Sequence, residues 1–250
     1  MEIIFLASTR VELPVLQPAG KQQSNVKKSK ILQILTLGNV NVRRRLHNRY
    51  LIVLLDIFDN DLLSSSLLNL SRMCMTSAEF VEIALGPNIQ LYYSQIFMKP
   101  PSIGNKAPWH QDFAFYAHTR ADLLNVHIYI DDSTVENGCL RVVPGSRKLG
   151  ILNHFKDGVF TGELQGDTSQ YDEQEIVLPM KAGGMVMWHT MTLHRSYPNK
   201  STKQRRALVL AYKNPEARLM GGAWNTLAEV RSVGLMVRGQ DPTGQLLAAH

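Results

Sequence analysis

The pattern of hydrophobic and polar positions changes at Ile89. From there, short runs of β-branched, aromatic and aliphatic residues are separated by turn-forming pairs of Pro, Gly and Asn. Runs of this length at such intervals are typical of antiparallel sandwiches and barrels. The pattern therefore predicts a mainly β fold, a jelly roll, with strands at Ile89–Met98, Leu123–Ile130, Leu140–Val143, Glu175–Leu178, Met185–His189 and Ala207–Tyr212.

One of these runs, Leu123–Ile130, alternates in polarity. Residues two apart on a strand point to the same side. One side of the strand therefore carries Val126, Ile128 and Ile130, and the other carries Asn125, His127 and Tyr129. We expect the first side to pack in the core and the second to line a polar lumen.

Before Ile89 the pattern predicts one clear helix. Thr76 can cap it with Glu79 three positions later, and Gly86-Pro87 ends it. Residues 1–72 show no sustained periodicity, and we interpret them as a basic, poorly specified N-terminal segment that is partly helical. Residues 73–220 are expected to form the β domain and residues 221–250 a C-terminal extension. Within the β domain, Gly158 to Asp172 is expected to be a long loop over one end of the barrel.

Composition is ordinary for a folded globular enzyme, with 44% hydrophobic and 19% charged residues. The net charge of +6 could suggest a nucleic-acid partner. However, residues 1–72 hold ten basic and five acidic residues, so the rest of the chain carries a charge of only +1. A basic terminal segment is more often solvated than used for recognition. We therefore expect no nucleic-acid partner.

The two cysteines, Cys74 and Cys139, do not suggest a disulfide framework or a zinc site. We expect them to be buried free thiols. The longest apolar run is far shorter than the roughly 20 residues that span a bilayer, so no membrane association is expected. The apolar stretch Ile3 to Ala7 lacks a preceding basic region. Together these features predict an intracellular, cytoplasmic protein.

His110-Gln111-Asp112 places two potential metal ligands two positions apart. On an extended chain such side chains point to the same side and can bind one ion. A histidine from another strand would complete the two-histidine, one-carboxylate triad that holds non-haem iron(II). His194 is the candidate. Because the chain has eight histidines, such a pair also arises by chance, and a purely structural role is the alternative.

Arg205 and Arg206 stand at the start of the last predicted strand. Alternation aims their side chains at opposite faces, so one points inward and one outward. A buried arginine needs an anion, and no acid lies close in sequence. A dicarboxylate co-substrate would supply one, since a guanidinium group matches a carboxylate in bidentate geometry. The alternative is that both arginines are exposed.

Several motifs, in this order, resemble the phytanoyl-CoA hydroxylase (phytanoyl-CoA dioxygenase) family over about Ile89 to Tyr212. They are Lys99-Pro100-Pro101, Pro108-Trp109-His110-Gln111-Asp112, Glu136-Asn137-Gly138-Cys139-Leu140, Pro144-Gly145-Ser146, and His194-Arg195-Ser196 with Asn199 and Arg205. The resemblance implies a double-stranded β-helix, a cupin-like jelly roll, with flanking N-terminal helices. The first seventy residues show no such resemblance. Ile128 stands where a tryptophan is common in the family, and we expect this replacement to reshape the pocket.

The resemblance also implies roles for individual residues. The iron ligands would be His110, Asp112 and His194. The residues that bind 2-oxoglutarate would be Arg205 and Ser196, at its far carboxylate, together with Gln95 and Asn125. Trp109, Phe113, Phe115 and Tyr116 flank the ligands and could shape a pocket, although aromatic residues on strands are more often part of a core.

The implied activity is that of an Fe(II)- and 2-oxoglutarate-dependent dioxygenase. Such an enzyme uses O2 to hydroxylate an unactivated C–H bond of a small molecule and releases succinate and CO2. The alternative is a catalytically inactive jelly-roll binding protein that retains the metal motif. A halogenase would carry Ala or Gly in place of the ligand aspartate, so Asp112 argues against that activity. The sequence specifies neither the substrate nor the oligomeric state.

Overall fold

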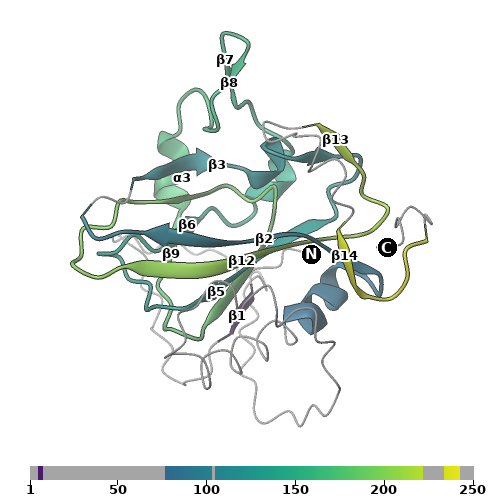
Figure 1. Cartoon of the computed structure of the whole chain (residues 1–250). Helices are drawn as coiled ribbons and strands as arrows, with labels where there is room; N and C mark the ends of the chain where they lie inside the picture. Colours follow the sequence, from purple (N-terminus) through teal and green to yellow (C-terminus); the bar gives the residue numbers. More distant parts are fainter. Residues whose placement is uncertain (1–4, 8–76, 103–104, 222–233, 243–250) are drawn as a thin grey trace, which may run out of the picture.

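The computed structural model describes residues 5–7, 77–102, 105–221 and 234–242, and two facing antiparallel sheets form the centre of this part of the chain (Figure 1). The larger sheet has the strand order β1 (Phe5–Ala7), β10 (Met185–His189), β5 (Leu123–Tyr129), β12 (Arg205–Lys213), β2 (Ile89–Lys99) and β14 (Leu235–Arg238). The smaller sheet has the order β3 (Ala107–His110), β11 (His194–Ser196), β6 (Leu140–Val142) and β9 (Ile176–Leu178). This architecture confirms the predicted double-stranded β-helix.

The other elements connect or cover the sheets. They are a helix over residues 77–85, the 3-10 turns η2 (Asp112–Ala114) and η3 (Ser146–Leu149), the paired strands β4 (Ala117–His118) and β13 (Leu219–Gly221), the hairpin β7 (Phe155–Lys156) and β8 (Val159–Phe160), and the helix α3 (Ser169–Gln174). The hairpin projects at the top of Figure 1.

The expectation of a long loop from Gly158 to Asp172 is wrong in part, because β8 and the start of α3 lie within it. Only one residue of α3, Tyr171, is buried. It packs against Trp109, Val143 and Leu193. A single buried position cannot produce a helical period in the sequence. The helix is stabilised by these distant contacts instead.

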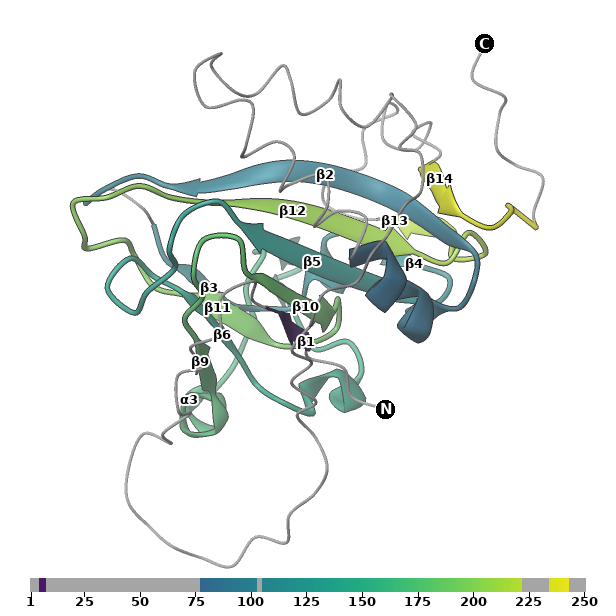
Figure 2. The same ribbon diagram turned by 90° about the horizontal axis from the view of Figure 1, so that it is seen from below.

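The strands divide the apolar residues into an outer and an inner core. In the outer core, Val126 and Ile128 of β5 pack with Phe80 and Val81 of the helix over residues 77–85. In the inner core, between the two sheets, Tyr129 packs with residues of both sheets, among them Leu140, Val142, Trp188 and Ala207. The alternation predicted for β5 is therefore confirmed. Figure 2 shows β2, β12 and β5 side by side in the larger sheet.

The helix over residues 77–85 agrees with the predicted one, although the proposed cap Thr76 lies outside the described residues. Gly86 ends it with a φ of +88°. Its N–H group donates to the carbonyl oxygen of Glu82 at 2.9 Å. Arg238 of β14 forms ion pairs with Glu79 and Glu82. These pairs hold the helix next to the edge of the larger sheet.

Parts of the two outer segments add strands to the larger sheet. β1 pairs with β10, and β14 pairs with β2. Most of residues 1–72 and of the C-terminal extension lies outside the described residues, so the division of the chain into three segments stays a prediction. Cys139 is a buried free thiol as expected, whereas Cys74 is not among the described residues. Within the described part of the chain, no helix has the length and apolar character to span a membrane.

His118 of β4 makes the stability of the fold depend on pH. Its ring is buried, its Nδ1 lies 2.7 Å from the carbonyl oxygen of Tyr116, and its Nε2 has no hydrogen-bond partner among the described residues. Burial lowers the pKa of His118 from 6.5 to about 4; the Tyr116 carbonyl opposes this shift and Lys213 adds to it. Between these values the unfolded chain binds a proton that the folded chain does not. The free energy of unfolding should therefore fall as the pH drops from 6.5 to 4, by at most about 1.4 kcal/mol per pH unit from this group.

Urea denaturation at pH 7 and pH 5 tests this prediction when wild type is compared with His118→Phe. The variant keeps an aromatic ring beside Tyr92 but cannot titrate. We expect it to lose less stability than wild type between the two pH values. Equal losses would show that His118 does not contribute.

Candidate metal centre

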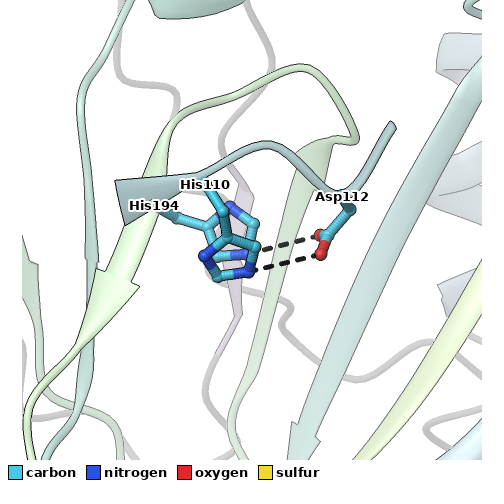
Figure 3. A group of neighbouring side chains, drawn as sticks. All are labelled: His110, Asp112 and His194. Atoms are coloured by element: carbon cyan, nitrogen blue, oxygen red, sulfur yellow. Dashed lines mark ion pairs between the residues drawn. The ribbon is translucent and has the colours of Figure 1, made fainter. Parts of the chain in front are cut away.

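His110, Asp112 and His194 come together at one end of the smaller sheet (Figure 3). His110 ends β3 and His194 begins β11, and the two residues lie opposite each other in antiparallel register. Gln111 keeps an extended backbone, and Asp112 begins the 3-10 turn η2. One ligand atom from each of the three side chains lies within 4.8 Å of the others. The spacing that suggested a shared ion in the sequence therefore corresponds to a real cluster.

Backbone carbonyls fix the orientation of both imidazole rings. Nδ1 of His110 lies 2.7 Å from the oxygen of Pro108, and Nδ1 of His194 lies 2.9 Å from the oxygen of Thr192. Because a carbonyl only accepts, each Nδ1 carries the hydrogen and each Nε2 presents a lone pair. The Nε2 atoms lie 3.6 and 3.4 Å from the carboxylate oxygens of Asp112. Two such nitrogens and one carboxylate fit a non-haem iron(II) ion.

Asp112 is held as an ionised carboxylate. Its oxygen Oδ2 accepts hydrogen bonds from Nδ2 of Asn125 at 2.5 Å and from Nε1 of Trp188 at 3.4 Å. Burial alone would raise the pKa of Asp112, but the imidazoles of His194 and His110 outweigh it and lower the pKa well below the usual value. The pKa of His194, which burial alone would lower, is raised by Asp112 and by the Thr192 carbonyl. The two imidazoles therefore keep Asp112 in the ionised form that binds a metal ion.

Gln111 and His154, for which no role was predicted, support the ligands through hydrogen bonds. The side chain of Gln111 donates to the carbonyl oxygens of Gly150 and Met191 and accepts from the N–H group of Leu152. The backbone N–H of Gln111 donates to Nε2 of His154 at 3.0 Å. These bonds fix the turn between His110 and Asp112. The middle position of the motif therefore faces away from the cluster and anchors it.

Arg205 and Arg206 point to opposite faces of β12, as predicted. Arg206 faces outward and forms two 2.9 Å hydrogen bonds with Asp131. Arg205 is 5% exposed, and one of its terminal nitrogens donates to the carbonyl oxygen of Gly138. Nε of Arg205 has no partner within the described part of the chain. Burial lowers the pKa of Arg205, whereas Tyr129 and Cys139 raise it by a smaller amount.

The other predicted co-substrate residues also face the space between the two sheets, which we call the lumen. Ser196 is 8% exposed and lies two positions after His194, on the same side of β11. Gln95 lies opposite Val209 in β12, on the face that carries Arg205. Asn125 donates to Asp112, so its side chain is already engaged at the metal centre. The roles of all three at a co-substrate stay predictions.

The effect expected at Ile128 is wrong. Ile128 packs in the outer core with the helix over residues 77–85 and so faces away from the lumen. The lumen residue beside it is His127, whose ring lies 4.3 Å from that of Trp188 and 6.1 Å from that of Phe97. Burial and the charge of Arg205 lower the pKa of His127 to about 3. His127 is therefore a neutral side chain within electrostatic reach of Arg205, Asp112 and His194.

An ion-pair network on the outer face of the smaller sheet supports the strands that carry the two histidines. Arg195 points outward and pairs with Asp172 at 2.7 Å and with Glu175 at 2.6 Å. Its guanidinium group lies 4.5 Å from the ring centroid of Trp109. Nε1 of Trp109 donates to Asp172 at 2.7 Å. Because Trp109 precedes one histidine and Arg195 follows the other, α3 fixes both strands from outside.

Gly138 should be intolerant of any side chain. It has a φ of +78°, and a Cβ atom there would lie 2.1 Å from the carbonyl oxygen of Tyr197. We expect Gly138→Ala to lower the free energy of unfolding by about 2 to 5 kcal/mol, through backbone strain and overlap. It would also displace the carbonyl that holds Arg205. Thermal denaturation measures the loss.

Gly158→Ala is a matched control for this substitution. Gly158 has the same φ of +78°, but a Cβ atom there meets nothing within 4 Å. Gly158→Ala should therefore lower the free energy of unfolding only through backbone strain, by about 1 to 2 kcal/mol. If the two variants melt at the same temperature, the close approach of Gly138 to Tyr197 has no energetic importance.

Comparison with protein families places the chain in a known group. A family model described as phytanoyl-CoA dioxygenase (PhyH) matches residues 16–207. The match begins far before Ile89, so the expectation that the first seventy residues do not resemble the family is wrong.

The curated relatives are named as dioxygenases and hydroxylases, and one of the names includes alpha-ketoglutarate, the older term for 2-oxoglutarate. A probable alpha-ketoglutarate-dependent hypophosphite dioxygenase from Stutzerimonas stutzeri is 38% identical over 148 residues, covering 56% of this chain and 51% of the relative. An L-proline trans-4-hydroxylase from Streptomyces griseoviridis is 31% identical over 157 residues, covering 52% of this chain and 57% of the relative. The chain spans about half the length of the curated relatives it matches.

Solved structures support the fold. A non-heme alpha ketoglutarate dependent carbocyclase, SnoK, from nogalamycin biosynthesis aligns with a TM-score of 0.53 at 24% identity, covering 66% of each chain. A non-heme monooxygenase, ThoJ, gives the same TM-score and identity over 65% of this chain and 58% of its own. The family match covers most of the sequence and includes the three clustered residues and Arg205. This chain therefore belongs to the phytanoyl-CoA dioxygenase family.

Proposed function

We propose that this chain is an iron(II)- and 2-oxoglutarate-dependent dioxygenase that hydroxylates an unactivated C–H bond of a small molecule. The observation that carries the proposal is the cluster of His110, Asp112 and His194, whose ligand atoms lie within 4.8 Å of one another. The buried Arg205, whose Nε has no partner among the described residues, supports an anionic co-substrate in the same lumen. The names of the relatives agree with this chemistry.

Each residue has a separate task in this proposal. The two Nε2 atoms and the Asp112 carboxylate would hold the iron, as the two-histidine, one-carboxylate donor set does for non-haem iron(II). Bound iron, with 2-oxoglutarate and O2, supplies the oxidation that hydroxylates the substrate and yields succinate and CO2. Asn125 and Trp188 keep the Asp112 carboxylate in place. Arg205 and Ser196 bind the far carboxylate of 2-oxoglutarate.

Aromatic rings beside His110 would form one wall of the substrate pocket. The ring of Phe115 lies 5.8 Å from that of His110, and Phe160 of the projecting hairpin lies 5.0 Å from Phe115. Apolar rings in these places would exclude water from the reacting centre. Trp109, Phe113 and Tyr116, which the sequence also suggested, are instead buried in core clusters.

Succinate formation tests the proposal. The purified chain is loaded anaerobically with Fe(II), given 2-oxoglutarate and air, and screened against a broad library of metabolites. The library must be broad because the relatives are named for substrates as different as hypophosphite and L-proline. We expect substrate-dependent succinate with one hydroxylated product. A chain that binds neither Fe(II) nor 2-oxoglutarate, or binds both without forming succinate, is the inactive binding protein.

A further inference from the structure

Unsatisfied polar atoms gather at one place in the lumen. Four buried side-chain atoms lack a hydrogen-bond partner among the described residues, and three of them belong to Arg205, Tyr129 and Ser133. The fourth belongs to His118, on β4. Buried polar groups in folded proteins are almost always hydrogen-bonded, and an exception requires an explanation. Three exceptions in one neighbourhood indicate a binding site rather than a packing defect.

Tyr129 lies beside Arg205 on the adjacent strand. It stands opposite Ala207 in the pairing of β5 with β12, and Ala207 points to the same side as Arg205, two positions away. Its ring is 1% exposed and packs in the inner core. Arg205 is close enough to lower the pKa of Tyr129, and Tyr129 raises that of Arg205. The hydroxyl of Ser133 lies near that of Tyr129 and also lowers its pKa, but the two do not form a hydrogen bond of normal length and angle.

The chemistry of this group selects a carboxylate ligand. Burial, opposed by Arg205, raises the pKa of Tyr129 to about 12, so at neutral pH its hydroxyl keeps its proton and can donate. Arg205 has only donors, and a hydroxyl beside a guanidinium group is complementary to an ionised acid. The nearby Lys99 gives its Nζ hydrogens to the carbonyl oxygens of Asn105 and Tyr197, each at 2.7 Å. The guanidinium group of Arg205 and the hydroxyl of Tyr129 are therefore left as donors for one carboxylate.

We propose that Tyr129 is a co-substrate-binding residue whose hydroxyl donates a hydrogen bond to the far carboxylate of 2-oxoglutarate beside Arg205. This inference rests on the proposed function. Tyr129 is absent from the residues that the family motifs identify. Because its ring is packed in the inner core, it also closes the lumen behind the carboxylate and limits the length of the 2-oxo acid. A 2-oxo acid that is one carbon longer, 2-oxoadipate, should bind more weakly than 2-oxoglutarate.

The test is anaerobic calorimetric titration of the Fe(II)-loaded chain with 2-oxoglutarate, for wild type and Tyr129→Phe. We expect the variant to raise the Kd about 10- to 100-fold, the value of one hydrogen bond to a charged group. Titration with 2-oxobutyrate, which lacks the far carboxylate, should give the same Kd for both proteins. The melting temperature of the ligand-free variant should equal or exceed that of wild type, because the lost hydroxyl has no partner.

Tyr212→Phe is the matched control. Tyr212 is also a buried tyrosine of the larger sheet, but it belongs to the outer core, and its hydroxyl pairs with Ser77 at 3.1 Å. Tyr212→Phe should leave the Kd for 2-oxoglutarate unchanged.

If wild type fails to bind 2-oxoglutarate at all, the proposed function is wrong. If wild type binds it and Tyr129→Phe binds equally well, only the role of Tyr129 is wrong. A lower melting temperature together with an equal loss for both oxo acids would mean that Tyr129 is merely structural.

Discussion

Asp112→Ala should lose the metal ion and all turnover. Asp112 supplies the one carboxylate of the cluster, and its oxygens face the Nε2 atoms of both histidines. Loss of second-shell partners alone typically weakens metal binding 10- to 100-fold, so loss of a direct ligand should weaken Fe(II) binding by at least about 100-fold. Anaerobic Fe(II) titration measures the affinity, and succinate release measures turnover.

A second aspartate provides the control for this experiment. Asp131 is ion-paired with the outward-facing Arg206, on the other side of β12 from the lumen. Asp131→Ala should leave Fe(II) affinity at the wild-type value. If Asp112→Ala still binds Fe(II) like wild type, or still forms succinate, then the assignment of the metal centre is wrong.

Arg205→Met should remove 2-oxoglutarate binding while sparing the metal. Removal of one partner of a buried, hydrogen-bonded charge pair typically costs 2 to 5 kcal/mol, so the Kd should rise by at least about 30-fold. The ligand-free protein should not be destabilised, since methionine fills similar space and a buried charge with an unpartnered Nε disappears. Calorimetry with Fe(II)-loaded protein gives the Kd, and a separate Fe(II) titration shows that the metal centre is intact.

The neighbouring arginine is the matched control for Arg205. Arg206→Met removes the same charge one position along β12, but from the outer face, where Arg206 pairs with Asp131. It should leave the Kd for 2-oxoglutarate unchanged. Equal losses in the two variants would show that the net charge of the strand is what matters, and would remove Arg205 from the site.

Much of the larger sheet could be predicted from the sequence because its strands are long and apolar. Met185–His189 has the predicted bounds, and β5 and β12 differ from prediction by only a few residues. The strands that carry the histidines were harder to find. β3 has four residues, one of them proline, and β11 has three, two of them charged or ionisable. Such segments have no period, and their pairing with distant strands alone makes them strands.

The metal cluster was predictable in part. Spacing identified His110 and Asp112, whereas His194 was one candidate among eight histidines until the family resemblance supported it. The supporting residues needed the fold. Trp188 lies on a strand whose bounds were predicted correctly, yet alternation within one strand cannot say which face meets the lumen. Its bond to Asp112 depends on the pairing of β10 with β5, where Trp188 lies opposite Asn125.

The ion pairs of Arg195 on the outer face of the smaller sheet also determine which side chains of β11 face the lumen. β11 has only three residues, and its inward His194 and Ser196 alternate with the outward Arg195. A slip of one residue in its pairing would place a guanidinium group beside Asp112 and turn the histidine toward α3. Such a slip would break the pairs of Arg195 with Asp172 and Glu175. Asp172 and Glu175 therefore stabilise the pairing register that keeps His194 and Ser196 facing the lumen.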